Sequence, residues 1–461
     1  MISFRKKSVT FLWRIENYFV SLRENLKDIM KYLLTLASVL LLFCACSSDD
    51  TADFTNTKST RAVMVYMAGE NSLTLTNNNR FLNNDLKEIV EGSKYLANDQ
   101  RLFVFVDSLG TNRNYKGTPY IIEVHGGQIY NRKEFSSDFS SADPTRFREI
   151  ISWMTNNIPA NGYGLVLWGH ATGWLVEPDS IATTGSSPRR AYGLDTNEDR
   201  GSENETWLNI TQMAQVMKGL PKMDFIFGDC CHMISAETGY ELRNATNYLI
   251  GSPAEIPGNG APYDKMVPQL FKNGSELYRG IIDTYYDHYT EDFKNISKPW
   301  KGYSVPLAVI DTRYIAQLAQ ATRDVLTQFT DGYPNYPTTP SLKGLVFYCG
   351  INAPLMYDMR GYIKKYTSES TFRAWDQVYQ QAVPYYRMSM RWMTSYNGYL
   401  SYNMIYEFEN NSFDQDPTLY GCVSMFIPRQ MTYYDSGRYR YNTTSKNFSW
   451  NQLIDWSRFG W

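Results

Sequence analysis

The sequence has 461 residues, of which 43% are hydrophobic and 20% charged, and its formal net charge is −2. A globular protein of this length can form one large domain or two. The near-neutral charge gives no support for a nucleic acid or another acidic polymer as a partner.

The N-terminal part predicts an export signal. Residues 30–45 combine a basic residue, a short apolar run and small residues before a cysteine, which is the pattern of a secretory signal. The apolar run is shorter than the roughly 20 residues that a membrane span needs. Ala45 and Cys46 resemble a bacterial lipoprotein cleavage site, so Cys46 is the expected lipidated residue, with Cys44 as a competitor.

The segments on either side of this signal carry no predicted fold. Residues 1–29 contain six basic residues and are interpreted as a mis-started extension, with Met30 as the initiator. Residues 46–60 are expected to be a flexible tether. Its acidic start resembles the surface-export signal of Bacteroidetes lipoproteins. We therefore expect an exported protein, lipid-anchored to the bacterial outer membrane and exposed at the cell surface.

Short apolar runs then alternate with helical patterns along the first half of the chain. The runs predict strands at residues 62–68, 101–107, 120–124, 164–168, 224–227 and 248–252. The helical patterns cover residues 78–96, 143–157, 208–218 and 236–244. Continuous apolar strands separated by helices are typical of a parallel sheet that is covered on both faces.

The second half repeats this alternation less regularly. It predicts strands at residues 305–310, 345–349 and 420–428, and helices at residues 313–329 and 371–390. No linker rich in glycine, proline or serine divides the chain. We therefore expect an α/β core over residues 61–310 and an α/β extension over residues 311–461 that packs on it.

Two of the predicted strands end in residues that suit acyl-transfer chemistry. His170 follows the run at 164–168, and Cys231 follows the run at 224–227. Catalytic groups in open α/β sheets gather at the carboxyl ends of the strands, where a cysteine can meet its base. His170 is thus the expected base and Cys231 the expected nucleophile, although a structural role for His170 stays open.

The remaining histidines and cysteines fit this chemistry less well. His125 is expected in a turn, His288 in a surface helix, and His232 beside the nucleophile but pointing away from it. Cys349 and Cys422 lie in apolar runs and are expected in the core. Zinc is not expected at Cys230 and Cys231, and neither is disulfide exchange, because the Cys-x-x-Cys spacing is absent.

Asp229 precedes Cys231 by two residues, so in an extended strand both side chains lie on the same side. A carboxylate there raises the pKa of the thiol, so it does not activate the nucleophile and must have a different role. It could pair with a lysine or arginine side chain of a substrate. Alternatively, it could cap the helix that follows. The two interpretations stay open at this point.

These residues together resemble the clostripain family. The similarity lies in the blocks at residues 229–233 and 236–243, and in Trp168-Gly169-His170 with Gly173-Trp174. Members of that family are caspase-like α/β/α sandwiches and cysteine endopeptidases that cut after arginine or lysine. The resemblance implies that His170 and Cys231 are catalytic and that Asp229 belongs to the pocket for the basic residue.

The resemblance has further implications for the site. Backbone N–H groups of Ala171 and Cys231 would form the oxyanion hole. Self-cleavage is expected in the loop at residues 175–205, after Arg189 or Arg190. Calcium dependence is implied as well, although the sequence contains no EF-hand loop. The chain departs from the family pattern at Ala171, Cys230 and His232.

The sequence therefore predicts a lipid-anchored cysteine endopeptidase whose partners are proteins or peptides with arginine or lysine before the scissile bond. The alternative is a catalytically silent, surface-exposed binding lipoprotein on the same caspase-like scaffold. Labelling of Cys231 by a thiol-reactive arginyl probe separates the two.

Overall fold

The computed structural model describes residues 58–74, 81–109, 117–175, 191–196, 205–294, 301–327, 341–352, 354–395, 403–410, 412–429 and 441–456. The chain divides into two units, Met1–Asn56 and Thr57–Trp461, and all described residues lie in the second. The predicted extension, the signal and Cys46 lie outside the described residues. So do Arg189 and Arg190.

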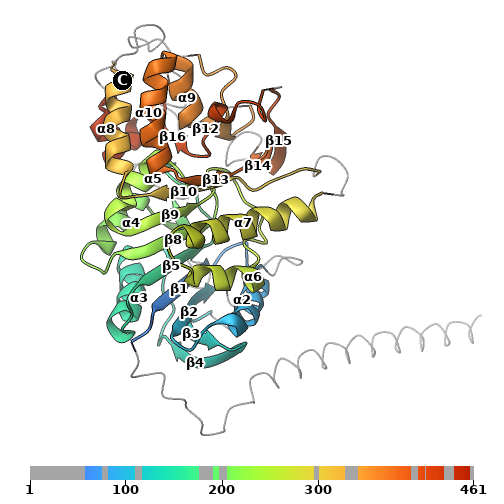
Figure 1. Ribbon diagram of the computed structural model, residues 1–461. Helices are drawn as coiled ribbons and strands as arrows, with labels where there is room; N and C mark the ends of the chain where they lie inside the picture. The colour runs from blue at the N-terminus through green and yellow to red at the C-terminus, as the bar shows by residue number, and fades with distance from the viewer. Residues whose placement is uncertain are drawn as a thin grey trace, which may run out of the picture. The chain divides into compact units, whose positions relative to one another are not determined.

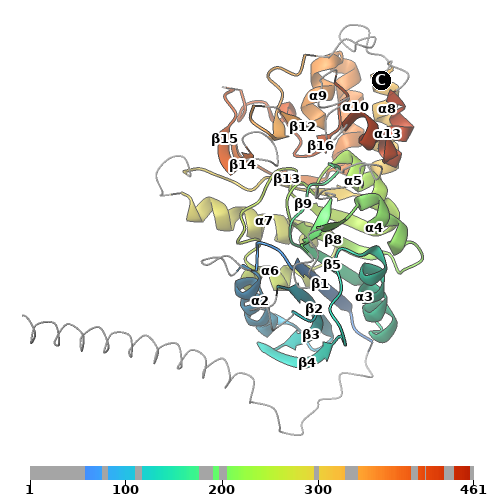
Figure 2. The same cartoon turned by 180° about the vertical axis from the view of Figure 1, so that it is seen from behind.

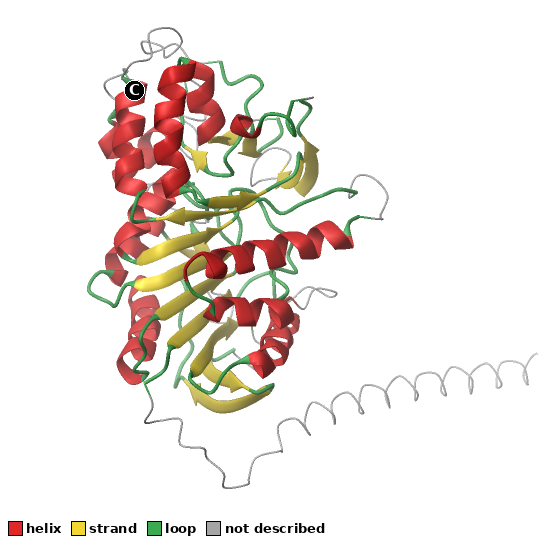
Figure 3. Ribbon diagram, viewed as in Figure 1, coloured by secondary structure: helices red, strands yellow, loops and turns green. Residues whose placement is uncertain are grey.

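A nine-stranded sheet forms the centre of the second unit, with strand order β13-β10-β9-β8-β5-β1-β2-β3-β4 (Figures 1 and 3). Its middle strands are mutually parallel, and antiparallel strands flank them at both edges. The parallel strands are β9 (Thr246–Gly251), β8 (Met223–Asp229), β5 (Tyr163–Trp168), β1 (Arg61–Gly69) and β2 (Gln100–Ser108). The antiparallel ones are β10 (Leu307–Asp311) with β13 (Tyr385–Arg387), and β3 (Tyr120–His125) with β4 (Gln128–Glu134).

Helices cover both faces of this sheet, as Figure 1 and the reverse view in Figure 2 show. One face carries α3 (Pro144–Asn157), α4 (Ile210–Met217) and α5 (Ala236–Glu241), and the other α2 (Phe81–Gly92), α6 (Tyr263–Met266) and α7 (Gly274–Asp292). Side chains of β1 alternate between the two hydrophobic cores, with Tyr66 in the first and Val65 in the second. This explains the continuous apolar runs, because both sides of each central strand are buried.

Local sequence signals fix where the helices begin. The Asp143 carboxylate accepts the N–H groups of Thr145 and Arg146, and Pro144 occupies the first helical position of α3. At α5 the Ser235 hydroxyl accepts the N–H of Thr238. These caps place the helices directly after the loops that connect them to the sheet.

The C-terminal part of the unit adds small sheets and further helices (Figure 3). Its helices are α8 (Ile315–Leu326), α9 (Met359–Tyr366), α10 (Glu369–Ala382), α12 (Tyr441–Thr444) and α13 (Ser449–Ile454). Its strands are β11 (Phe347–Cys349), β12 (Leu355–Asp358), β16 (Ser424–Met425), β14 (Arg391–Ser395) and β15 (Asn403–Glu407). A two-stranded ribbon of β6 (Tyr192–Asp195) and β7 (Thr206–Leu208) lies in the first half. The division of the chain at residue 310 stays a prediction.

None of the helices in the described part of the chain has both the length and the apolar character required to cross a bilayer.

The predicted fold class, a mostly parallel α/β sandwich, is confirmed. Several elements differ from the prediction, of which three are instructive. Strand β4 was missed because all its residues are exposed, so no apolar alternation marks it. The helix expected at 371–390 ends at Ala382, since Pro384 cannot continue it, and β13 follows. The late strand at 420–428 shrinks to Ser424–Met425.

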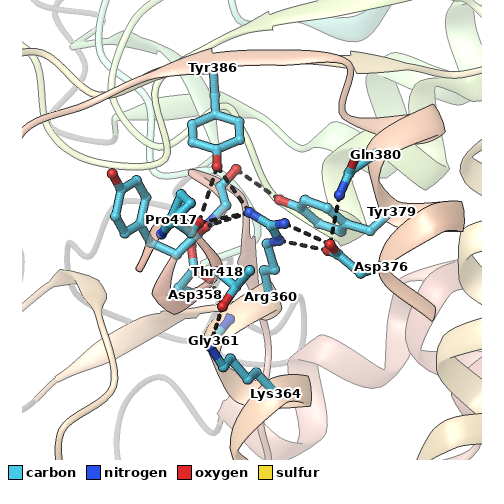
Figure 4. Close-up of polar contacts among 12 residues, drawn as sticks. Asp358, Arg360, Gly361, Lys364, Asp376, Tyr379, Gln380, Tyr386, Pro417 and Thr418 are labelled. Carbon is cyan, nitrogen blue, oxygen red and sulfur yellow. Dashed lines mark hydrogen bonds and ion pairs between the residues drawn. The ribbon is translucent and has the colours of Figure 1, made fainter. Parts of the chain in front are cut away.

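A buried ion pair joins two helices of the C-terminal part (Figure 4). Arg360 of α9 donates from Nε and Nη2 to the two carboxylate oxygens of Asp376 of α10, at 2.6 and 2.7 Å. Its Nη1 donates to the carbonyl of Pro417 at 2.8 Å and to the Tyr386 hydroxyl at 3.1 Å. The guanidinium thereby links α9, α10, β13 and the turn at Pro417, and its planar fork fits the carboxylate.

We expect Arg360→Ala to destabilise the protein by about 3–5 kcal/mol, because it leaves the Asp376 carboxylate buried without its partner. Urea unfolding measures the change. Arg373→Ala is the matched control. It removes an exposed pair with Glu369, and it should cost less than about 1 kcal/mol. Equal losses in the two variants would contradict the role given to the buried pair.

Candidate active site

The parallel pairing of β5 and β8 brings the two predicted catalytic residues to one edge of the sheet. In their register Trp168 pairs with Asp229, so His170 and Cys231 each follow a paired position by two residues. The loops beyond the strands also meet. Gly173 has a φ of +61°, and a Cβ there would collide with the carbonyl oxygen of His232. Only glycine permits both this backbone conformation and this close approach.

His170 is half-buried, and its Nε2 lies 3.0 Å from the hydroxyl oxygen of Ser72. Its carbonyl accepts the N–H of Gly193 at 2.8 Å. Burial lowers the pKa of His170 to about 4. The imidazole is therefore neutral at physiological pH and able to accept a proton.

The sulfur of Cys231 accepts the N–H of Ile256 at 3.4 Å. Burial, together with the charges of Glu255 and Asp229, raises the pKa of the Cys231 thiol to about 12. Cys231 is thus a neutral thiol in this structure. Since His170 is neutral as well, the pair does not rest as a thiolate and an imidazolium.

The adjacent cysteines lie on opposite faces of the sheet. Cys230 is fully buried in the core beneath α3, α4 and α5, whereas Cys231 is partly exposed and contacts the core beneath α2, α6 and α7. Burial raises the pKa of the Cys230 thiol well above its ordinary value. A thiol of this kind is inert, which agrees with the choice of Cys231 over Cys230.

Asp229 is buried among hydrogen-bond donors from the second face. Its carboxylate accepts the hydroxyl of Tyr263 at 2.8 Å, the hydroxyl of Tyr285 at 3.0 Å and the N–H of Ala261 at 3.1 Å. Burial raises the pKa of Asp229, and these three hydrogen bonds oppose that shift. The helix that follows, α5, is capped by Ser235 instead. The capping alternative for Asp229 is therefore wrong.

A second carboxylate, which sequence reasoning missed, lies next to Asp229. Asp85 of α2 is buried and accepts the indole N–H of Trp168 at 2.6 Å. A Cβ on Gly260 would lie 2.7 Å from Asp229 Oδ2 and 3.3 Å from Asp85 Oδ2. Burial and the charge of Asp229 raise the pKa of Asp85 to about 9. Two buried carboxyl groups thus lie close together near Cys231, and burial favours the neutral form of each.

The predicted oxyanion-hole residues lie on the two strand tips. Ala171 does not have a positive φ, so an alanine meets no backbone strain there. It forms an isolated bridge with Tyr192. The role of the Ala171 and Cys231 N–H groups stays a prediction.

The described segment that follows Arg190 is bound directly to the histidine loop. The carbonyl of Ala191 accepts the N–H of Thr172 at 2.7 Å, and Gly193 donates to His170. The two residues predicted for self-cleavage therefore precede a segment that holds the backbone on both sides of Ala171.

One group of carboxylates has the donor chemistry that calcium requires. Oxygens of Glu70, Asp107 and Asp138 lie within 4.8 Å of one another. Within the described part of the chain, Asp107 Oδ1 is buried and has no hydrogen-bond partner. Burial raises the pKa of Asp107, with the charges of Asp195 and Glu70 adding to it. Calcium takes oxygen ligands of this kind, so these residues fit the implied ion.

Comparisons with known proteins agree with this geometry. The model of the clostripain family matches residues 65–461. A secreted C11 cysteine protease from Bacteroides thetaiotaomicron, solved in complex with an irreversible peptide inhibitor, has a TM-score of 0.66 and 25% identity, over 86% of this chain and 99% of that chain. An inactive zymogen C11 protease from Parabacteroides distasonis has a TM-score of 0.64 and 23% identity, over 86% and 99%. Among curated proteins, none has a sequence that matches this chain.

The neutral resting thiol predicts slow, pH-dependent alkylation of Cys231 by iodoacetamide. At pH 7.5 we expect labelling at least roughly a hundredfold slower than that of an exposed cysteine, because little thiolate is present. The rate should rise about tenfold per pH unit up to pH 9.5. Mass spectrometry of the labelled peptide measures it, with Cys231→Ser as the control for Cys230. A rate that does not change between pH 6 and pH 9 would indicate a preformed ion pair and contradict this expectation.

Proposed function

The chain belongs to the clostripain family and is a cysteine protease, and from this premise we propose that it is an endopeptidase that cuts after arginine or lysine with Cys231 as nucleophile and His170 as base. The observation that carries the assignment is the register of β5 and β8, which places both residues at the same sheet edge. Asp229, buried beside the nucleophile, supports the preference for a basic residue.

The neutral pair suggests how the reaction starts. His170 takes the proton of the Cys231 thiol as the sulfur attacks the peptide carbonyl carbon, so the ions form only when substrate is in place. The N–H groups of Ala171 and Cys231 then stabilise the tetrahedral oxyanion. His170 gives its proton to the leaving amine. Water next attacks the acyl-enzyme, with His170 as base, and releases the acid and the thiol.

The acidic region explains a preference for arginine or lysine. Asp229 and Asp85 are both buried, and a cation between them would favour the ionised form of both carboxyl groups. A guanidinium or ammonium group entering this region would therefore be stabilised by charge-assisted hydrogen bonds. Tyr263 and Tyr285 hold the Asp229 carboxylate in a fixed orientation toward such a group.

We further propose that the chain activates itself by cutting after Arg189 or Arg190, and that Cys46 is its lipid anchor. The hydrogen bonds that Thr172 N–H donates to Ala191 and that Gly193 N–H donates to His170 support the first proposal, since they hold the backbone on both sides of Ala171, a proposed oxyanion-hole residue. The zymogen among the similar structures agrees with it. Secreted proteases among those structures agree with export of this chain.

N-terminal sequencing of the purified protein tests catalysis and self-cleavage together. We expect wild type to yield a new terminus at Arg190 or Ala191, and Cys231→Ala to stay uncut because it lacks the nucleophile. Cys230→Ala is the matched control and should be cut like wild type. An uncut Cys230→Ala protein beside a cut Cys231→Ala protein would reverse the assignment. A wild type that is uncut and takes up no arginyl chloromethyl ketone would favour the silent binding protein.

Specificity depends on the charge of Asp229. In Asp229→Asn we expect kcat/KM for arginyl peptides to fall by about tenfold or more relative to neutral peptides, because a charge-assisted hydrogen bond is lost. Paired fluorogenic substrates measure the ratio. Asp224→Asn, at the other end of β8, removes an equal charge and should leave the ratio unchanged. An unchanged ratio in Asp229→Asn would assign Asp229 a purely structural role.

A further inference from the structure

His232, the residue after the nucleophile, has no part in the proposed reaction. It is fully buried and has a φ of +57°, a conformation that a residue with a side chain adopts only when its surroundings hold it. Its N–H donates to the carbonyl of Ala254 at 3.0 Å. This turn directs the imidazole into the protein, toward the loop that follows β9.

The imidazole meets two other potential ligands there. A ring nitrogen of His232, a carboxylate oxygen of Glu255 and the sulfur of Cys349 all lie within 4.8 Å of one another, and all three residues are buried. Nε2 is 3.8 Å from Glu255 Oε1. The same Glu255 oxygen accepts the N–H of Ser395 at 3.1 Å, which fixes the carboxylate. Three separate segments thus contribute one donor atom each.

A hydrogen bond fixes the orientation of the His232 ring. Its Nδ1 lies 2.9 Å from the carbonyl oxygen of Pro253, which can only accept a hydrogen bond. Nδ1 is therefore the donor to this carbonyl, and Nε2 is the ring nitrogen that faces Glu255. A backbone carbonyl that holds the second ring nitrogen in this way is the usual support of a metal-bound histidine.

We propose that His232, Glu255 and Cys349 bind a zinc ion behind the catalytic cysteine. Nitrogen, oxygen and sulfur donors together suit zinc, whose tetrahedral sites keep ligand atoms roughly 3.3–3.8 Å apart. The site is also balanced in charge. A carboxylate and a thiolate neutralise the two positive charges of the ion, and Cys349 releases its proton to solvent as the bond to sulfur forms.

The ion would stabilise the catalytic turn rather than take part in the reaction. Glu255 precedes Ile256, whose N–H contacts the sulfur of Cys231. Cys349 belongs to β11 of the C-terminal part. Zinc would therefore tie the turn at Cys231 to its neighbouring loop and to β11. This inference is independent of substrate specificity and of the identity of the catalytic base.

The test uses the Cys231→Ala protein, so that the catalytic thiol neither binds metal nor cuts the chain. After dialysis against metal-free buffer and addition of zinc, elemental analysis should find about one ion per chain. Substitution by Co²⁺ should give a sulfur-to-metal charge-transfer band in the near ultraviolet. Cys349→Ser in this background should lose the band, and Cys422→Ser, which alters an equally buried cysteine, should keep it.

Two further variants separate loss of ligands from loss of fold. Glu255→Gln and His232→Leu should each weaken zinc binding by about tenfold or more, while circular dichroism reports an unchanged fold. A Cys231→Ala protein that takes up no zinc overturns the proposal. So does a charge-transfer band that survives Cys349→Ser, or zinc affinity that neither Glu255→Gln nor His232→Leu changes.

Discussion

The parallel register of β5 and β8 is the constraint on which the rest of the site depends. Because Trp168 pairs with Asp229, the residues that follow in the two loops lie near one another at the same edge of the sheet. His170 and Cys231 meet at one edge, Gly173 packs under the carbonyl of His232, and the indole of Trp168 reaches Asp85. A shift of β8 by one residue in this register would turn Asp229 to the face opposite Trp168 and separate these contacts.

Successive side chains at the end of β8 face opposite sides of the sheet and therefore have different environments. Asp229 and Cys231 face the side of α2, α6 and α7, where tyrosine hydroxyls and a second carboxyl group lie near Asp229. Cys230 faces the apolar core on the other side of the sheet. Adjacent residues of the same type therefore have different environments. Burial keeps the His170 and Cys231 side chains uncharged in this structure, because it lowers the pKa of the imidazole and raises that of the thiol.

The central strands, and the position of His170 and Cys231 at one edge of the sheet, were predictable because they leave strong local signals. The runs before His170 and Cys231 are apolar on both faces, which only a buried parallel strand needs. Asp85 and Tyr285 were not predictable, since their contacts with Trp168 and Asp229 join positions 83 and 56 residues apart. Neither was the inward turn of His232, because its φ depends on the loop it packs against. The exposed strand β4 has no apolar period that could reveal it.

Arg189 and Arg190 lie between His170 and Cys231 in the sequence, and this order has a consequence for quaternary structure. A cut at either residue would leave His170 on the N-terminal product and Cys231 on the C-terminal one. The two products would still share the ladder between β5 and β8 and the hydrogen bonds from Ala191 and Gly193 to the histidine loop. The mature enzyme would then be a two-chain heterodimer whose catalytic pair spans the subunit interface, and separating the chains would abolish activity without breaking a covalent bond.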